Sequence, residues 1–301
     1  MSIVLGANQY GKAEVRLVRV TRDTARHRIT DLNVTSQLRG DFAACHTDGD
    51  NAKVIATDTQ KNTVYAFARD GVGAPESFLV RLARHFTASP QVTGGRWAAE
   101  QYGWSRIAGH DHAFVRSGGE KRTALVHADA SGLTVLAGLR DCTVLKSTGS
   151  EFSGFPRDRF TTLPETDDRV LATDLTAWWR YEPSFAESAT DADFDARYPA
   201  VRDLMLATFA ELHSLALQQT VFAMGRAVLE AFDDVAEVRL SCPNNHHFLV
   251  DLAPFGLDNP GEVFFAADRP YGLIEAAVVR SGPDEAPPPE HPVWATIGGF
   301  A

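Results

Sequence analysis

The stretch KAEVRLVRVTRDTARHRITDLNVTSQLRGD, residues 12–41, decides the fold class of this chain. Its first part, residues 12–22, is rich in Val and Leu and short of helix breakers, which favours a β-strand. Residues 23–27 (DTARH) then predict a turn, and residues 28–41 predict a returning strand. Two strands joined by a short turn pair antiparallel, so we expect the chain to begin with an antiparallel hairpin.

Two helices are predicted directly after this hairpin. The segment TDTQKNTVYAFARD, residues 57–70, has a helical pattern. A second helix should start at Pro75, because proline suits the first helical position. Its apolar face would comprise Phe78, Leu79, Leu82 and Phe86. Strand-like segments near 93–106, 112–118 and 122–127 complete the first half of the chain.

The second half repeats this order of elements. We expect strands at 142–148 and 169–181, helices near 199–213 and 217–232, strands near 236–241, 246–252, 262–267 and 273–280, and a Pro-rich tail at 281–294. The echo between VIATDT (54–59) and VLATDL (170–175) also suggests duplication. The order predicts an α+β fold of two ββααββ units, residues 1–138 and 139–301, with antiparallel sheets and helices on one face. The other face should then be polar or covered by a partner subunit.

Composition narrows the class of protein. The chain has 301 residues, 44% of them hydrophobic, which is enough for one large or two ordinary domains. Its formal net charge of −10 disfavours nucleic acid and anionic membranes as partners. Three cysteines match no metal motif, and no signal peptide, membrane helix or terminal Ser-Lys-Leu signal is present, so we expect a reduced, cytoplasmic protein.

The segment PNNHHFLVDL, residues 243–252, places four polar residues before an apolar strand. Because side chains alternate along a strand, Asn244 and His246 should share one face, whereas Asn245 and His247 should point the other way. The ordinary alternative is that Asn244 caps a turn and that His246 is a hydrogen-bonded edge histidine.

Other candidate site residues also have ordinary readings when each is taken alone. Thr57 or Asp58 could cap a helix, and the free N–H groups there could instead bind an anion. Lys12 could be solvated, Phe152 could belong to the core, Arg169 could form a surface ion pair with a preceding aspartate, and Gln218 simply begins a helix. The HDH triplet at 110–112 lacks a third metal ligand at a telling distance, and no phosphate loop, GxGxxG, CxxC or nucleophile elbow occurs. No metal site is therefore predicted.

Six motifs, taken together, resemble those of the urate oxidase (uricase) family. They are YGK, ATDTQKNTVY, LTVLKSTGSEF, TTLPETDDR, LQQT and PNNHHF, in the family's order and spacing. The likeness covers residues 8–279 approximately. It implies the tunnelling fold (T-fold), in which four chains form a homotetramer around a tunnel and each site lies between two subunits. Lys12, Thr57 and Asp58 would come from one subunit, and the neighbour would supply Phe152, Arg169, Leu217, Gln218, Asn244 and His246.

The resemblance also implies a reaction. Urate would be oxidised by O2 and water to 5-hydroxyisourate and hydrogen peroxide, with no cofactor. Arg169 and Gln218 suit the polar rim of a purine anion, Phe152 suits its face, and the backbone of Leu217 and Thr57 could donate to it. Lys12, Thr57 and His246 would relay protons, and Asn244 would hold O2 or water. Leu217 stands where relatives often have valine, and Asn245 and His247 stand where they often have Lys and Tyr.

Two other functions remain open from the sequence. One is a T-fold enzyme acting on a pterin or a GTP-derived ring, although the Cys and His ligands that its zinc-dependent members need are not found. The other is a purine-binding or scaffold oligomer without catalysis. The presence of Lys12, Thr57 and His246 together favours the enzyme.

Overall fold

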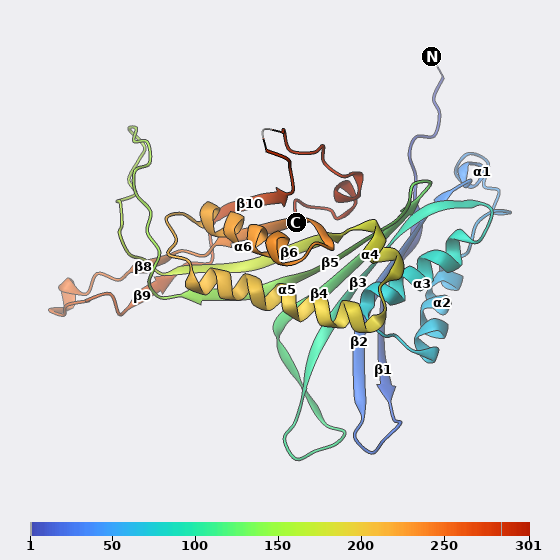
Figure 1. The fold of residues 1–301 in the computed structure, drawn as a ribbon, viewed down its shortest axis with the longest axis horizontal. Helices are drawn as coiled ribbons and strands as arrows, with labels where there is room; N and C mark the ends of the chain where they lie inside the picture. The colour runs from blue at the N-terminus through green and yellow to red at the C-terminus, as the bar shows by residue number, and fades with distance from the viewer. Residues whose placement is uncertain (1, 284) are drawn as a thin grey trace.

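One eight-stranded antiparallel sheet organises the protein (Figure 1). The structure, a computed structural model, describes residues 2–283 and 285–301. The sheet has the strand order β1-β2-β3-β4-β5-β6-β7-β10. These strands are β1 (Tyr10–Thr21), β2 (Arg28–Gly40), β3 (Val92–Arg106), β4 (Phe114–Asp129), β5 (Gly132–Lys146), β6 (Leu171–Tyr181), β7 (Val235–Asn244) and β10 (Gly272–Val279). In the described chain, β1 and β10 form the two edges, and neither has an outer partner.

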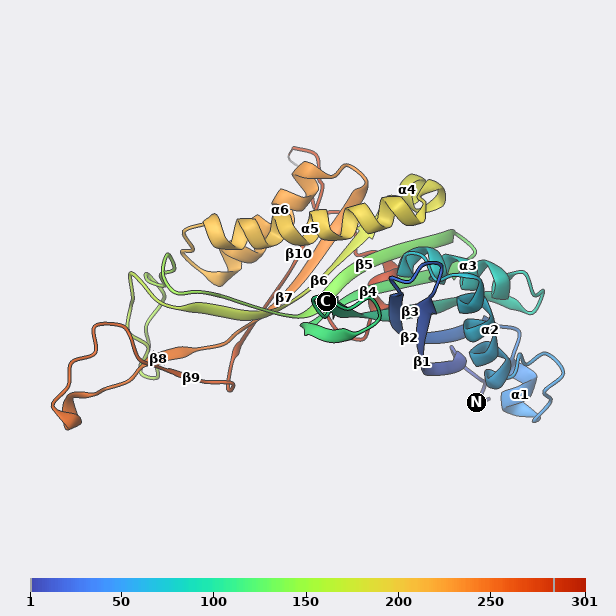
Figure 2. The ribbon, with the colours of Figure 1, turned by 90° about the horizontal axis from the view of Figure 1, so that it is seen from below.

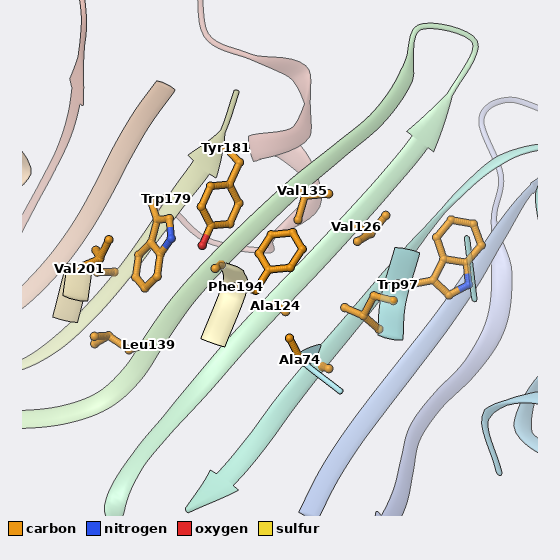
Figure 3. Close-up of a cluster of buried hydrophobic side chains, with 14 of the residues drawn as sticks. Ala74, Trp97, Ala124, Val126, Val135, Leu139, Trp179, Tyr181, Phe194 and Val201 are labelled. Atoms are coloured by element: carbon orange, nitrogen blue, oxygen red, sulfur yellow. The ribbon is translucent and has the colours of Figure 1, made fainter. Parts of the chain in front are cut away.

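The long helices cover one face of this sheet (Figure 2). They are α2 (Thr57–Asp70), α3 (Pro75–Thr87), α5 (Asp191–Glu211) and α6 (Leu217–Ala231), with short helices α1 (Ala43–Thr47) and α4 (Pro183–Ser188). A single layer of buried side chains joins both halves of the chain, and Figure 3 shows Trp179, Tyr181 and Phe194 close together with Trp97 further along. None of the described helices is both long and apolar enough to cross a membrane.

The other face of the sheet is partly covered by the chain's own C-terminal segment. Trp294, on a short 3-10 helix (Pro292–Thr296), is 2% exposed and packs with Leu125 and Leu136. The guanidinium of Arg239 lies 4.3 Å from the Trp294 ring. The Pro-rich tail therefore closes back on the sheet, and no second subunit is needed to cover this part of the face.

The duplicated element order is confirmed, with two strands, two long helices and two strands in each half. Between the last two strands lies an additional hairpin of β8 (His247–Leu249) and β9 (Phe264–Ala266). The predicted boundary at residue 138 falls inside β5. We propose that the units instead meet in the turn at residues 130–131, where β4 ends and β5 begins.

Several predicted element bounds are wrong for identifiable reasons. The helix expected from 199 begins at Asp191, because Thr190 and Asp193 form a capping box; Pro199 lies inside the helix. The strands expected at 112–118 and 122–127 are one strand, β4. The strand expected at 142 begins ten residues earlier, at Gly132, and Asp141 with φ of 59° lies at a bulge in it.

Candidate active site

A cavity of about 470 Å³ lies where the segment between β5 and β6 meets the ends of β7 and β8. Phe152, Arg169, Asn244 and His246 all line it. Phe152 and Arg169 come from residues 147–170, Asn244 is the last residue of β7, and His246 follows it. In Figure 1 this is the end of the molecule that carries β8 and β9. The sequence-predicted cluster from the second half is thus largely brought together.

Arg169 supplies a cation that has no carboxylate partner among the described residues. Its Nε is buried without a hydrogen bond, and burial lowers the pKa of its guanidinium. The neighbouring Asp168 does not pair with it, because that carboxylate accepts from Thr148 Oγ1 at 2.8 Å and Gly149 N at 3.0 Å. The surface ion pair considered from sequence is therefore absent at Asp168, and Arg169 is suited to binding an anion.

Phe152 provides an aromatic face held by two contacts. Its backbone pairs with Thr166 through hydrogen bonds of 2.9 and 3.1 Å. Its ring stacks on Phe155 with centroids 5.0 Å apart and an interplanar angle of 14°. The Arg169 guanidinium lies 5.3 Å from the Phe152 centroid. A flat anion could therefore stack on this ring while the guanidinium binds its edge.

His246 is held by its backbone and has an altered acidity. Its carbonyl accepts a hydrogen bond from Ala267 N at 2.9 Å. Burial, and secondarily the Arg169 charge, lower the pKa of its imidazole below the ordinary value. A lowered pKa keeps the ring neutral near pH 7, so that it has a lone pair with which to accept a proton.

The strand predicted at 246–252 is present only as the shorter β8, and His246 lies outside it, because β7 ends at Asn244 and β8 begins at His247. Asn245 points away from the cavity as expected, and its Nδ2 donates to Asp174 Oδ2 at 2.9 Å. His247, however, lines the same cavity as His246. Its Nδ1 lies 3.0 Å from Asn245 O, and since a carbonyl only accepts, Nδ1 is the donor of this hydrogen bond. Sequence alternation missed this residue because the chain leaves the strand geometry here.

Leu217 and Gln218 do not line this cavity. They are the first two residues of α6, with Leu217 buried and Gln218 exposed. Glu151 N donates to Ser214 O at 2.8 Å, which ties the start of α6 to the segment that carries Phe152. No side chain caps α6, and its first two N–H groups, those of Leu217 and Gln218, are available as donors.

Lys12, Thr57 and Asp58 form a second cluster. Lys12 lies on β1, and Thr57 and Asp58 begin α2. The capping prediction is wrong, because Ala56 occupies the cap position and no side chain caps the helix. The hydrogen bond from Lys61 is the main cause of a lowered pKa of the Asp58 carboxyl, and the Lys12 charge contributes weakly. Asp58 also accepts from Asn62 at 2.9 Å, so its carboxylate is paired within its own helix.

The two clusters lie far apart in this chain. Lys12 is on the edge strand β1, whereas Asn244 ends β7, beside the opposite edge. Figures 1 and 2 show α1 and α2 at one end of the molecule and β8 and β9 at the other. One cluster has the cation and the aromatic ring, and the other has the lysine and the threonine.

Among residues 2–283 and 285–301, no group of three or more His, Cys, Asp or Glu side chains is arranged to hold a metal ion. His112 lies 6.1 Å from the ring of His27, and the Asp111 carbonyl accepts from the His27 backbone at 2.9 Å. The HDH triplet therefore serves loop contacts in this structure.

Comparison with known proteins connects this chain to one family. Residues 8–127 and 135–275 match the family model described as Uricase. The chain is 62% identical over 299 residues to the uricase of Arthrobacter globiformis, covering 99% of this chain and 96% of that protein. It is 36% identical to the uricase of Cyberlindnera jadinii, covering 93% and 98%.

Solved structures agree with these sequence matches. The crystal structure of uricase from Arthrobacter globiformis superposes with a TM-score of 0.91 at 62% identity, covering 98% of this chain and 100% of that one. Urate oxidase from Bacillus sp. TB-90 gives a TM-score of 0.76 at 24% identity over 91% of this chain and 100% of the other, which shows a shared fold. The expected α+β T-fold is confirmed.

Proposed function

The chain belongs to the uricase family and is a urate-oxidising oxidoreductase, and from this premise we propose how and where it acts. The proposed reaction is urate + O2 + H2O → 5-hydroxyisourate + H2O2, as a step of purine catabolism that needs no cofactor. The observation that carries the proposal is the pair of incomplete clusters at opposite ends of the chain. A second copy of the chain would bring the Lys12 cluster of one subunit to the Arg169 cavity of its neighbour.

The Arg169 cavity supports binding of a planar purine anion. The guanidinium of Arg169 has no carboxylate partner within the described chain and can donate two parallel hydrogen bonds to one edge of urate. Phe152 supplies the stacking face. Gln218, exposed at the start of α6, would donate and accept along another edge. Free N–H groups of Leu217 and of Thr57 would add neutral donors to the anion.

The proton steps would use Lys12, Thr57 and His246. Urate must lose a proton to become a strong enough electron donor, and its two electrons then reduce O2 to peroxide. Water adds its oxygen to the oxidised ring, and the released protons go to peroxide. Neutral His246 is suited to accept one of these protons, and the Thr57 hydroxyl could pass it on to or from Lys12. Asn244 would hold O2, and afterwards water, above the ring.

The open sheet edges support an oligomer. Both β1 and β10 lack an outer neighbour in the described chain, and exposed strand edges pair readily with a second chain. We propose the homotetramer that the family resemblance implies, with Asp58 near the subunit contact at the substrate.

The direct test follows urate absorbance in the ultraviolet together with O2 uptake and peroxide release, in the presence of a chelator. The proposal predicts loss of urate with one O2 consumed and one peroxide released per urate. Urate binding without turnover would indicate a binding protein instead. Turnover of a pterin or GTP but not urate, abolished by the chelator, would indicate the other T-fold chemistry.

A further inference from the structure

The structural problem at the second cluster is how Lys12 and Thr57 are held at a fixed separation. They come from different elements, β1 and α2, and no side chain caps α2. A proton relay needs the two side chains within hydrogen-bond reach, and a displacement of about 1 Å can slow a reaction strongly, so the elements that carry them must be held together. Two residues that the proposed reaction does not use, Tyr10 and Gln60, make this tie.

Tyr10 holds the peptide groups just before α2 from the strand side. Its hydroxyl accepts a hydrogen bond from Ile55 N at 2.8 Å and donates one to Ile55 O at 3.1 Å. The ring packs edge-on against Phe42 with centroids 4.8 Å apart. Tyr10 lies two residues before Lys12 on β1, and Ile55 lies two residues before Thr57. One phenol group therefore couples the segment that carries the lysine to the segment that carries the threonine.

Gln60 holds the same peptide from the helix side. It is fully buried in α2, and its Nε2 donates to Ile55 O at 3.4 Å. Its Oε1 accepts from Ser36 Oγ at 2.9 Å, and Ser36 is fully buried as well. Ser36 is the partner of Lys12 in the β1–β2 register. The contacts thus close a ring that runs Lys12, Tyr10, Ile55, Gln60, Ser36 and back to Lys12.

The strand geometry around Lys12 is also narrowly set. A Cβ placed on Gly11 would lie 1.8 Å from Ser36 O, so only glycine allows this approach of β1 to β2. The register shifts between Lys12 and Val15, and Glu14 has a φ of 56°. Such a bulge re-aims the side chains beside it. Lys12 is therefore the last residue of β1 that pairs in register with β2 before the bulge. The direction of its side chain depends on the contacts that hold β1 at this point.

We propose that Tyr10 and Gln60 are positioning residues that set the Lys12–Thr57 geometry by holding the Ile55 peptide from both sides. The inference rests on the proposed function, because it assumes that Lys12 and Thr57 move protons. Neither residue would touch urate. Their loss should therefore lower the rate of the chemical step and leave substrate binding intact.

The test compares Tyr10→Phe with Tyr65→Phe in the full-length protein. Tyr10→Phe removes only the hydroxyl that holds Ile55, and we expect kcat to fall about 10- to 100-fold with KM for urate changed less than about 3-fold. Tyr65 lies on the same helix and its hydroxyl donates to Arg16 O at 3.3 Å, away from Ile55. Tyr65→Phe should leave kcat within about 2-fold of the parent. A second variant, Gln60→Met, should repeat the effect of Tyr10→Phe.

Combining Tyr10→Phe with Lys12→Ala shows whether Tyr10 acts by positioning Lys12 or whether its loss disturbs the structure more widely. If Tyr10 acts through Lys12, adding Tyr10→Phe to Lys12→Ala should lower kcat by less than about 3-fold further, because coupled residues are not additive. Full multiplication of the two effects, or an unchanged kcat in both Tyr10→Phe and Gln60→Met, would overturn the inference. Parent-like kcat in Lys12→Ala and Thr57→Ala would instead overturn the proposed relay, so the two failures are distinguishable.

Discussion

Arg169 is the residue on which substrate binding depends in this account, and Lys12 and His246 are those on which turnover depends. Arg169→Ala should raise KM for urate by about 10- to 100-fold, because a charge-assisted hydrogen bond contributes about 1.5–3 kcal/mol. Lys12→Ala and His246→Ala should instead lower kcat by about 100-fold or more with little change in KM. Steady-state kinetics of the three variants measure both parameters. Equal effects on kcat and KM in all three would contradict the assigned roles.

The acidity of His246 gives a second prediction at this scale. Its pKa is lowered by burial and, to a lesser extent, by the charge of Arg169. Arg169→Gln should therefore move the pKa of His246 upward, only part of the way to its ordinary value, because the burial remains. An NMR titration of labelled histidine measures the change, and Arg157→Gln is the matched control, since Arg157 contacts Phe155 from the same segment. An unchanged or lower pKa in Arg169→Gln would refute the electrostatic coupling.

Individual site residues were predictable to different degrees. Arg169, Asn244, His246 and Phe152 do meet in one cavity, as the family motifs implied. The alternative structural role of each residue, such as a surface ion pair for Arg169, could not be rejected from the sequence. The burial and the hydrogen-bond partners of each side chain are set by segments distant in the chain. His247 was assigned to the wrong side, since its direction depends on where β7 ends and not on strand alternation.

Among the elements, a buried ion pair between α3 and β4 in the first half of the chain also contacts α5 in the second half. Glu76 on α3 is fully buried, and Arg122 on β4 donates to it at 2.7 Å and to Asp195 on α5 at 2.7 Å. Arg122→Met would leave Glu76 buried without a partner, and we expect a cost of about 3–5 kcal/mol.

The matched double variant distinguishes two causes of the lost stability: an unpaired buried charge on Glu76 and the loss of side-chain packing at Arg122. Arg122→Met combined with Glu76→Gln should recover a substantial part of the stability, because the buried charge is then removed as well. Equilibrium denaturation at constant protein concentration measures both variants. If the single variant costs less than about 1 kcal/mol, or if the double variant recovers nothing, the pair does not act in this way.

Local signals predicted some elements well and others poorly. The helix beginning at Pro75 was predicted at its observed start, because an amphipathic pattern and an N-terminal proline both mark it. The helix before it was also predicted, but its first residues Thr57 and Asp58 were considered as caps. The start of α5 was misplaced at Pro199, although a Thr190–Asp193 capping box was present in the sequence. The strand predicted at 142–148 missed the first ten residues of β5, because a bulge at Asp141 interrupts the strand pattern. These errors arise where one local signal competes with another.

The whole molecule is an open sheet, and we propose that each of its ends carries half of an active site. Lys12 is on the edge strand β1 at one end of the molecule, and Arg169 precedes β6 at the other end, so one folded chain keeps the two residues far apart. The repeated order of elements and the placement of the helices on one face were both predicted from the sequence, and both are confirmed. The coverage of part of the other face by Trp294 was not predicted, because a Pro-rich tail carries no signal for where it packs.

Complementation between inactive subunits tests whether each active site is built from two chains. Lys12→Ala and Arg169→Ala chains are co-expressed with different tags, and the mixed oligomer is isolated through both tags. If each site uses Lys12 of one subunit and Arg169 of its neighbour, random assembly restores about a quarter of the parent sites. As control, Lys12→Ala with Thr57→Ala should restore nothing, because both residues must come from the same subunit. Recovered urate turnover in the first mixture alone is the predicted result. Activity no greater than that of the separate variants would contradict a site shared between chains.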